Sequence, residues 1–285
     1  MNPPAQNWTR ADAREWIAVP AASDDKYSRG VLGLVTGSAQ YPGAAVLGAD
    51  AAVRTGVGMV RYLGDARAAD LVLHRRPEVV TGEGRVQAWL LGSGQDAATR
   101  TPAEAALLAD ALGQAVPFVL DAGALDLVAA ASGPVIITPH FRELARALAA
   151  RGIECSTDQI ANDPPHWARA ASEVLAATVL LKGATTYVAA PNGELLTVSG
   201  APSWLATAGT GDVLAGILGA LVATHARNIE EGGHRVLVRL GATAALVHGL
   251  AAARASAGGP IAALDVADTV PATIASLLTG GAAQQ

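Results

Sequence analysis

The chain has 285 residues, and its 20 Lys and Arg and 25 Asp and Glu side chains give a formal net charge of −5 at pH 7. Hydrophobic residues make up 51% of the sequence, and Cys155 is the one cysteine. These values exclude a basic protein that coats nucleic acid and an internal disulfide framework, and they favour a protein of the reducing cytoplasm with a well-buried core.

Two features that the sequence lacks bear on its location. The N-terminus has neither the basic region nor the apolar core of a signal peptide. The longest uncharged apolar run, Val213–Ala223, is too short to span a bilayer. We therefore expect a cytoplasmic protein whose partners include neither a membrane nor a nucleic acid.

The predicted elements alternate between strands and helices. After a lead-in over residues 1–25, which holds a short helix at 11–17, strands are predicted at 31–36, 59–63, 89–91, 118–121, 135–138 and 178–182. Helices are predicted at 44–55, 103–114, 143–151, 166–177, 213–224, 234–255 and 271–278, and a hairpin joins 187–190 to 195–198. Strands that end in Gly, Asp or Pro before a helix are typical of βαβ units.

The expected fold class is therefore α/β, with a mainly parallel central sheet flanked by helices on both faces. We expect one domain over residues 1–285, with a disordered tail at 280–285. In such sheets the ligand crevice lies at the carboxyl ends of the strands. The loops that reach this edge hold Gly37, Gly92, Asp121, His140 and Lys182.

The most informative motif is Ala208-Gly209-Thr210-Gly211-Asp212, which runs directly into an apolar segment typical of a buried helix. Free amides and the positive end of a helix make such a junction an anion site. Asp212 could take a proton from an alcohol while the amides of 209–211 stabilise charge on a phosphoryl group. The alternative is that Asp212 only caps its helix.

A second polar cluster follows the strand at 135–138, in the sequence Thr138-Pro139-His140-Phe141-Arg142-Glu143. His140 could hydrogen-bond a substrate, and Glu143 could hold Mg²⁺ through water, because Mg²⁺ prefers oxygen ligands and keeps several of its waters. The alternative is that Glu143 only favours the start of a helix by its charge.

A third cluster ends the strand at 178–182. Lys182 stands directly before Gly183, and its ammonium, with nearby amides and the hydroxyls of Thr185 and Thr186, suits the phosphate of a nucleotide. The alternative is a charge at a strand end that reaches water. The sequence contains no P-loop and no cluster with zinc spacing.

Taken together and in this order, five segments resemble one family, the ADP-dependent NAD(P)H-hydrate dehydratases of the ribokinase-like superfamily. These segments are Lys26–Gly30, Tyr41–Ala45, Thr138–His140, Lys182–Gly183 and Ala206–Asp212. The resemblance runs from about residue 10 to residue 278. The last segment is shared across the superfamily. The first three distinguish the dehydratases from its other members; sugar kinases, for example, typically have Asn where His140 stands.

The resemblance implies roles for individual residues. Asp212 would be the catalytic base, with Gly209 and Gly211 forming the anion hole. The residues implied to contact the hydrated dinucleotide are Ala45, Gly94, His140 and Asp212. Those implied to contact the nucleotide are Lys182, Gly183, Ala184, Thr185, Thr186 and Gly211. Glu143 would lie near a Mg²⁺ ion and bind it through water.

The chain departs from the family pattern at two places. It has Gly92-Ser93-Gly94 where the family often has Gly-Pro-Gly, a change that preserves the backbone shape. It also has Gly123 in place of the second carboxylate of an Asp-Ala-Asp-Ala-Leu run, which makes Asp121 a weaker candidate for the site. Some relatives carry a fused epimerase domain, for which we expect no room in this chain.

The activity implied by the resemblance is dehydration of the S-epimer of hydrated NADH and NADPH (NADHX and NADPHX) back to NADH and NADPH. ADP would donate the phosphoryl group in the presence of Mg²⁺, with AMP and phosphate as products, and the enzyme would be a hydro-lyase that assembles as a homotetramer. ADP rather than ATP rests on the resemblance alone. Two alternatives stay open: an ATP-dependent kinase of a small alcohol or vitamin precursor, and a non-catalytic nucleotide-binding module.

Overall fold

One sheet organises the part of the chain that the structure describes. The computed structural model describes residues 4–280, whose strands form a nine-stranded sheet in the order β1-β9-β8-β7-β6-β5-β4-β2-β3. The strands are β1 (Gln6–Asn7), β2 (Val31–Val35), β3 (Met59–Tyr62), β4 (Ala88–Leu91), β5 (Phe118–Leu120), β6 (Val135–Ile137), β7 (Thr178–Leu181), β8 (Thr186–Ala189) and β9 (Leu195–Val198). Neighbours pair in parallel except β7–β8 and β8–β9. The predicted mainly parallel sheet and the hairpin are confirmed.

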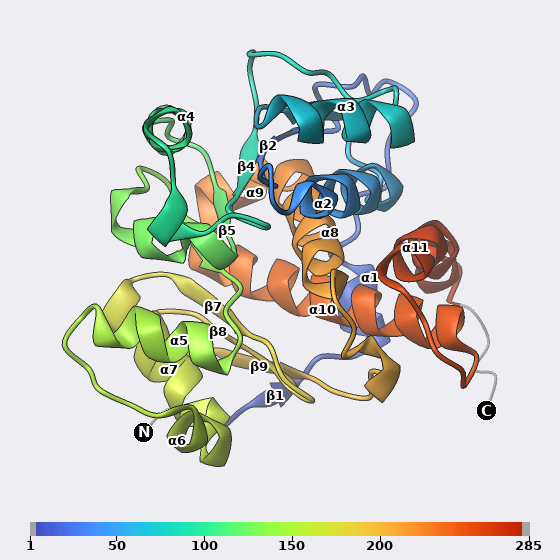
Figure 1. Cartoon of the computed structure of the whole chain (residues 1–285). Coiled ribbons are helices and arrows are strands. Elements are labelled where there is room, and N and C mark those ends of the chain that lie inside the picture. The colour runs from blue at the N-terminus through green and yellow to red at the C-terminus, as the bar shows by residue number, and fades with distance from the viewer. Residues whose placement is uncertain (1–3, 281–285) are drawn as a thin grey trace.

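Helices cover both faces of this sheet, as predicted (Figure 1). One face carries α1 (Arg10–Arg14), α2 (Pro42–Thr55), α3 (Ala66–Arg75), α8 (Thr210–Thr224), α9 (Ala226–Gly232), α10 (His234–Ser256) and α11 (Ala263–Leu278). The other carries α4 (Pro102–Leu112), α5 (Phe141–Ala149), α6 (Thr157–Asn162), α7 (Pro164–Leu175) and the 3₁₀ segment η2 (Ala122–Ala130). Two shorter 3₁₀ turns are η1 (Ala97–Thr99) and η3 (Ser203–Leu205).

The central strands β2, β4, β5 and β6 are apolar throughout because both of their faces are buried. In β2, Leu32 and Leu34 belong to one hydrophobic core, while Val31 and Val35 belong to the core on the opposite face. Successive side chains of a strand point to opposite faces, so a strand between two helical layers needs apolar residues at every position. This is why the strands read as continuous apolar runs in the sequence.

The lead-in adds an element that the sequence pattern does not reveal. The two exposed residues of β1 pair with β9, Gln6 opposite Leu196, and extend the sheet at its edge. The helix predicted at 11–17 is shorter and ends at Arg14. α3, α6 and α9 were also missed. Of the tail expected to be disordered, residues 281–285 lie outside the described residues.

The last helix begins eight residues earlier than predicted. Proline favours the first turn of a helix, so Pro271 indicated a start at 271. Instead α11 begins at Ala263, where Asp265 accepts a hydrogen bond of 2.8 Å from the Ala262 amide, and Pro271 lies inside the helix. Burial of Val266 and Val270 against the core outweighs the backbone hydrogen bond that this proline cannot make.

α10 has the length and composition of a membrane span. Its most apolar window has a mean hydropathy of 1.6, but 72% of that window is buried inside the structure. The helix packs against α8, α11 and the strands β6–β9, so its apolar character is accounted for by the core.

The packing of α2 against α8 prepares the functional edge. The residues that face each other are small, Gly48 and Ala51 on α2 and Gly216 on α8, so the two backbones approach closely. Both helices begin at the carboxyl edge of the sheet, after β2 and after η3 respectively. The packing therefore brings the predicted substrate loop before α2 next to the Gly-Thr-Gly-Asp turn that opens α8.

Candidate active site

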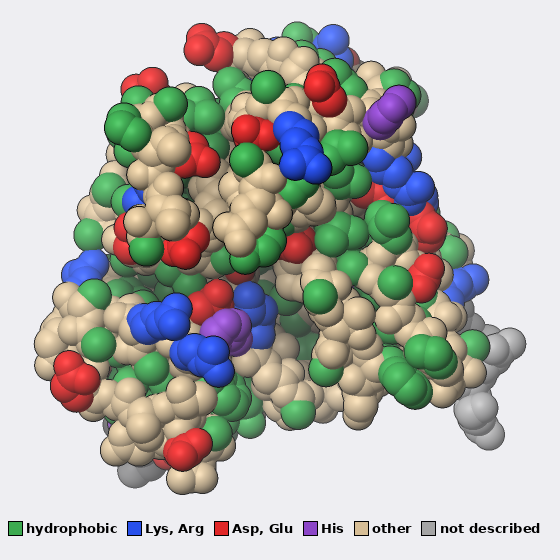
Figure 2. Space-filling view, viewed as in Figure 1, with side chains coloured by type: hydrophobic (Ala, Val, Ile, Leu, Met, Phe, Trp, Pro, Cys, Tyr) green, Lys and Arg blue, Asp and Glu red, His purple; other side chains and the backbone are tan. Residues whose placement is uncertain are grey.

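The loops after β2, β4, β5, β6 and β7 meet at the carboxyl edge of the sheet. The Gly37 amide donates a hydrogen bond of 2.6 Å to the Ser93 carbonyl, and the Ser93 hydroxyl donates one of 2.9 Å to Asp121. Lys182 contacts the same aspartate, and a β-bridge joins Lys182 to His140. Segments as far apart as residues 37 and 182 thus form one surface. Figure 2 shows charged side chains and a histidine gathered beside a hollow on this face of the molecule.

Asp121, which is buried, and Lys182, which is half-buried, form the ion pair at the centre of the site. The Lys182 ammonium lies 3.1 Å from Asp121 Oδ1, and Thr138 and Ser93 donate to the same carboxylate at 2.6 and 2.9 Å. Burial favours the neutral acid, but Lys182 and these two hydroxyls outweigh it and lower the pKa of Asp121. Burial opposes the charge on Lys182 as well, yet Asp121 and Glu143 raise the pKa of its ammonium. Both groups are ionised at neutral pH.

Asp212 lies in the first turn of α8, not before it as predicted. The helix begins three residues earlier than expected, and Gly209 occupies its N-cap with φ of 86°, a left-handed conformation that favours glycine. Asp212 therefore does not cap the helix in the way the alternative interpretation required. Its half-buried carboxyl has a pKa raised to about 7, because burial and the charge of Asp121 disfavour ionisation more than Lys182 favours it. A carboxyl with this pKa exchanges protons readily at neutral pH.

His140 and Glu143 open α5 with a reciprocal cap. Glu143 accepts a hydrogen bond of 2.8 Å from the His140 amide, and its own amide donates to His140 Nδ1 at 3.3 Å. The helix-start interpretation of Glu143 is therefore seen in the structure. The same carboxylate also faces the site, 3.7 Å from the Lys182 ammonium, while the His140 side chain is 51% exposed.

The donor set around Lys182 bears on whether the site suits Mg²⁺. Within residues 4–280, no group of three or more His, Cys, Asp or Glu side chains is arranged to hold a metal directly. Asp121 is occupied by three donors, whereas Glu143 has an oxygen that its helix cap does not use. One carboxylate fits a Mg²⁺ ion that keeps its waters and is shared with phosphates.

A cavity of about 550 Å³ lies beside Lys182 and the start of α8. Its polar end is formed by Lys182, Thr210 and Gly211, and the remainder of the wall is largely apolar. The lining residues are Lys182, Gly183, Ala184, Thr186, Ala201, Pro202, Ser203, Leu205, Ala206, Thr210, Gly211, Leu214 and His248. An apolar pocket with a cationic end that includes a helix N-terminus suits a nucleotide.

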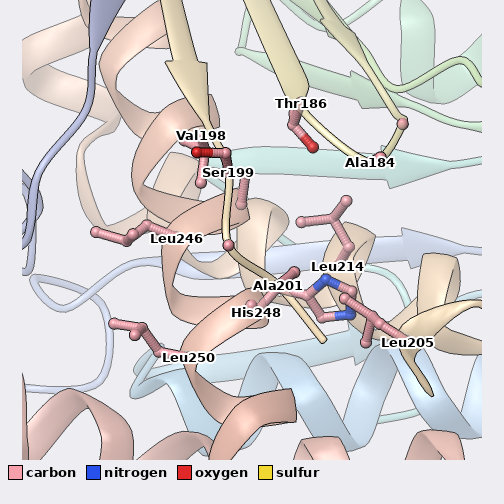
Figure 3. A pocket seen from close by; sticks show the side chains of 14 residues that line it. Ala184, Thr186, Val198, Ser199, Ala201, Leu205, Leu214, Leu246, His248 and Leu250 are labelled. Atoms are coloured by element: carbon pink, nitrogen blue, oxygen red, sulfur yellow. The ribbon is translucent and has the colours of Figure 1, made fainter. Parts of the chain in front are cut away.

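The cavity includes most of the predicted nucleotide-binding residues and adds others. Thr185 is the one member of the predicted run 182–186 that does not line it. The other lining residues, which the sequence did not predict as part of the site, are Ala201, Pro202, Ser203, Leu205, Ala206, Leu214 and His248. A smaller cavity of about 80 Å³ continues from it between β9 and α10, and His248 lines both (Figure 3).

The predicted dinucleotide-binding residues lie on the other side of Lys182. Ala45 has no exposed surface and packs under the Gly37 loop, so the structure does not bring it into the open part of the site. Gly94 is half-buried, against Ala44 and the Tyr41 carbonyl. A second cavity, of about 380 Å³, lies nearby. Its walls include Tyr41, Gln95, Asp96, Gly123, Asp126, Glu143 and Arg146.

The glycine at 123 has a steric reason in this chain. A Cβ atom there would lie 2.5 Å from the carbonyl carbon and oxygen of Gln95, closer than real Cβ contacts allow. Arg100, which pairs with Asp126 at 2.8 Å, holds this loop against Gly123 by a further hydrogen bond to its carbonyl. The family's usual aspartate therefore does not fit the observed backbone. Asp121, expected to be a weaker candidate, is central to the site.

The Lys26–Gly30 segment lies at the opposite edge of the sheet. Gly30 directly precedes β2, and Arg29 donates a hydrogen bond of 2.8 Å to the Gly56 carbonyl at the end of α2. Asp25 accepts from the amides of Tyr27 and Ser28, each at 2.8 Å. This segment, which helped to distinguish the dehydratases within the superfamily, covers the amino end of the sheet and does not reach the site.

The fold is ribokinase-like, and in it a Gly-Thr-Gly-Asp turn faces the cavity beside Lys182. A solved structure of ADP/ATP-dependent NAD(P)H-hydrate dehydratase from Bacillus subtilis, co-crystallised with ATP/Mg²⁺, superposes with a TM-score of 0.81 over 96% of this chain and 99% of that one, at 24% identity. A ribokinase-like superfamily protein from Enterococcus faecalis matches with a TM-score of 0.81 at 20% identity, covering 96% of each chain.

Sequence comparison gives the family. The family model for NAD(P)H-hydrate dehydratase matches residues 32–271, and the chain belongs to this family. It is 42% identical over 224 residues to the bifunctional NAD(P)H-hydrate repair enzyme Nnr of Mycobacterium tuberculosis, which covers 74% of this chain but 44% of that protein. The chain thus spans less than half the length of that relative. It is also 34% identical to the ADP-dependent (S)-NAD(P)H-hydrate dehydratase of Xanthomonas campestris pv. campestris, over 78% of this chain and 82% of that protein.

Proposed function

We propose that this chain is a cytoplasmic enzyme that dehydrates the S-epimer of hydrated NADH and NADPH with ADP as phosphoryl donor, giving NADH or NADPH, AMP and phosphate. The observation that carries the proposal is the Asp212 carboxyl, whose pKa is raised to about 7 at the start of α8, next to the cavity that Lys182 closes. A base and a cationic phosphate site on adjacent elements are what transfer of a phosphoryl group to an alcohol requires.

The reaction begins at the hydroxyl group of the hydrated nicotinamide ring. Asp212 takes the hydroxyl proton, and the oxygen attacks the terminal phosphorus of ADP while the bond to AMP breaks. The Lys182 ammonium and the amides of Gly209 and Gly211 stabilise the charge on the phosphoryl oxygens. Mg²⁺, bound through water at Glu143 and to the phosphates, would neutralise further phosphate charge.

The second half of the reaction is an elimination. The lone pair of the ring nitrogen expels phosphate from the new ester, and loss of the neighbouring ring proton restores the double bond of the dihydronicotinamide. In this scheme the larger cavity holds ADP, and the side with Gly94, His140 and the second cavity takes the dinucleotide. We further propose one catalytic domain over residues 1–285 and assembly as a homotetramer.

The names of two relatives support ADP as the donor. The Xanthomonas protein is called ADP-dependent, and the Bacillus protein, called ADP/ATP-dependent, was crystallised with ATP/Mg²⁺. A module that only binds nucleotides would need the glycine amides but not a base such as Asp212, which is evidence against a purely binding role.

The test is the absorbance of dihydronicotinamide after the purified chain is mixed with epimer-equilibrated NADHX, Mg²⁺ and either ADP or ATP. We expect a rise that depends on nucleotide and is faster with ADP. A flat trace with both nucleotides, from protein shown to be folded, would reject the dehydratase and favour the kinase of a small alcohol.

A further inference from the structure

His248 is a buried polar residue that the proposed chemistry does not use. It lies on α10, is 6% exposed and lines both the nucleotide-sized cavity and its smaller extension. In Figure 3 its ring lies beside Leu205, in a wall that is otherwise formed largely by aliphatic side chains and glycine. Its Nε2 atom is buried and has no hydrogen-bond partner among the described residues. A buried polar atom without a partner destabilises the folded protein, so this one requires an explanation.

The surroundings of the ring fix which of its nitrogens carries the proton. The Thr210 backbone favours the protonated form of the ring, as a carbonyl oxygen that faces a ring N–H does. Since Nε2 has no partner, the N–H that faces Thr210 is on Nδ1. Burial, together with the nearby Lys182 charge, lowers the pKa of His248 to about 4, so the ring is neutral at physiological pH. Nε2 therefore presents a lone pair, and it can only accept a hydrogen bond.

Because Nε2 is a hydrogen-bond acceptor, it can pair only with the donor groups of a nucleotide. Phosphate oxygens of ADP are themselves acceptors, so Nε2 does not pair with them. The donors that ADP offers are its two ribose hydroxyls and the amino group of adenine. All three belong to the nucleoside, the part of the ligand expected in the apolar region of the cavity when the phosphates lie at Lys182.

We infer that His248 Nε2 accepts a hydrogen bond from a donor group of the bound nucleoside, a ribose hydroxyl or the adenine amino group, and so determines which nucleotides the site takes. This inference rests on the proposed function, because it assumes that the cavity beside Lys182 holds the phosphoryl donor. Leu205, half-buried on η3, lies beside the ring in the same cavity wall. The bond then satisfies an atom that has no partner among the described residues.

The test compares four nucleotides on three proteins. ADP, 2′-deoxy-ADP, 3′-deoxy-ADP and IDP, which has an oxygen in place of the amino group, are titrated calorimetrically into the wild type, His248→Leu and His248→Gln. We expect the wild type to bind one analogue about tenfold more weakly than ADP, as the loss of one hydrogen bond implies. The analogue that is affected identifies the donor group.

The variants show whether His248 accepts the hydrogen bond from that donor group. His248→Leu should bind ADP about tenfold more weakly and no longer distinguish it from the affected analogue, and His248→Gln, which keeps an acceptor at similar reach, should regain part of the preference. His225→Gln is the matched control, because His225 is also buried but ends α8 at the far end from Asp212. It should leave the preference unchanged.

The outcomes separate this inference from the proposed function. If the wild type binds all four nucleotides equally, or if folded His248→Leu keeps the wild-type preference, the inference is wrong while the proposed function stands. If the wild type binds no adenine nucleotide, both are wrong. If His248 controls the nucleotide preference but no hydrated dinucleotide is dehydrated, the inference stands and the proposed reaction does not.

Discussion

The Lys182 ammonium lies 3.1 Å from Asp121 Oδ1, and this pair joins the ends of two strands that are 61 residues apart in the sequence. Two further carboxylates, those of Glu143 and Asp212, lie close enough to raise the pKa of the same ammonium. Asp121, hydrogen-bonded by three donors, keeps its charge. Asp212, close to that charge and half-buried, is the group that gains and loses a proton near neutral pH.

Replacing Asp212 by Asn should abolish most of the activity. Asn cannot take a proton, and positioned general bases typically contribute about 10²- to 10⁴-fold to a rate. We expect turnover to fall by that factor while calorimetric titration shows ADP binding close to that of the wild type. Near-normal turnover would show that another group removes the proton.

The pH profile of the reaction should report the same carboxyl. The pKa of Asp212 is about 7, and a base acts only when it is deprotonated. The ratio kcat/KM should therefore rise with pH and level off above about pH 7. A profile already flat from pH 5 would mean that the base ionises far more easily than its surroundings imply.

Asp212 should also cost the protein stability as the pH rises. Its pKa is raised from 3.8 to about 7, so the folded state binds the proton more tightly than the unfolded state does. This contribution is fully present below pH 3.8 and is lost as the pH rises through about 7. Between pH 5 and pH 8 the Tm of the wild type should thus fall relative to that of Asp212→Asn. If the Tm values of the two proteins change with pH in parallel, the predicted contribution of Asp212 is wrong.

Removing one partner of the central pair should be more harmful than removing both. Lys182→Met leaves the carboxylate of Asp121, with 5% of its side chain exposed, without its cation. A broken buried pair typically costs about 3–5 kcal/mol. Denaturant unfolding should show that loss, and the double variant Asp121→Asn with Lys182→Met should recover part of it. Additive losses in the double variant would mean that the two residues act independently.

Introducing the family's usual aspartate at position 123 should destabilise this chain. Its Cβ would collide with the Gln95 backbone, and overpacking of this kind typically costs about 1–3 kcal/mol. Gly113→Asp is the control, because a Cβ at Gly113 makes only ordinary contacts at the end of α4. Equal unfolding free energies for the two variants would show that the 95–100 loop yields readily.

The sequence predicts best what depends on local pattern. The sheet, most of the helices and the turn before α8 follow from apolar runs and glycine positions, and the parallel topology brings Asp121, His140 and Lys182 to one edge. β1 has no such signal, because two exposed polar residues become a strand only through their partner β9. The start of α11 was missed because burial overrides the preference of Pro271.

The candidate site was only partly predictable for a related reason. Gly123 suggested that Asp121 matters less, whereas its importance comes from Lys182, Ser93 and Thr138, which the fold alone brings together. His248 has no motif around it that indicates a ligand. Its unpartnered nitrogen becomes visible only when α10 is packed against the cavity.

The most direct test of the central claim follows one oxygen atom. The account holds that the ring hydroxyl attacks ADP, so the oxygen leaves the ring as part of phosphate. NADHX labelled with oxygen-18 in that hydroxyl is therefore incubated with the chain, Mg²⁺ and ADP, and the phosphate is analysed by mass spectrometry. We predict that each NADH formed is matched by one AMP and one phosphate carrying the label. Label released into water, with unlabelled phosphate, would contradict phosphoryl transfer to the substrate.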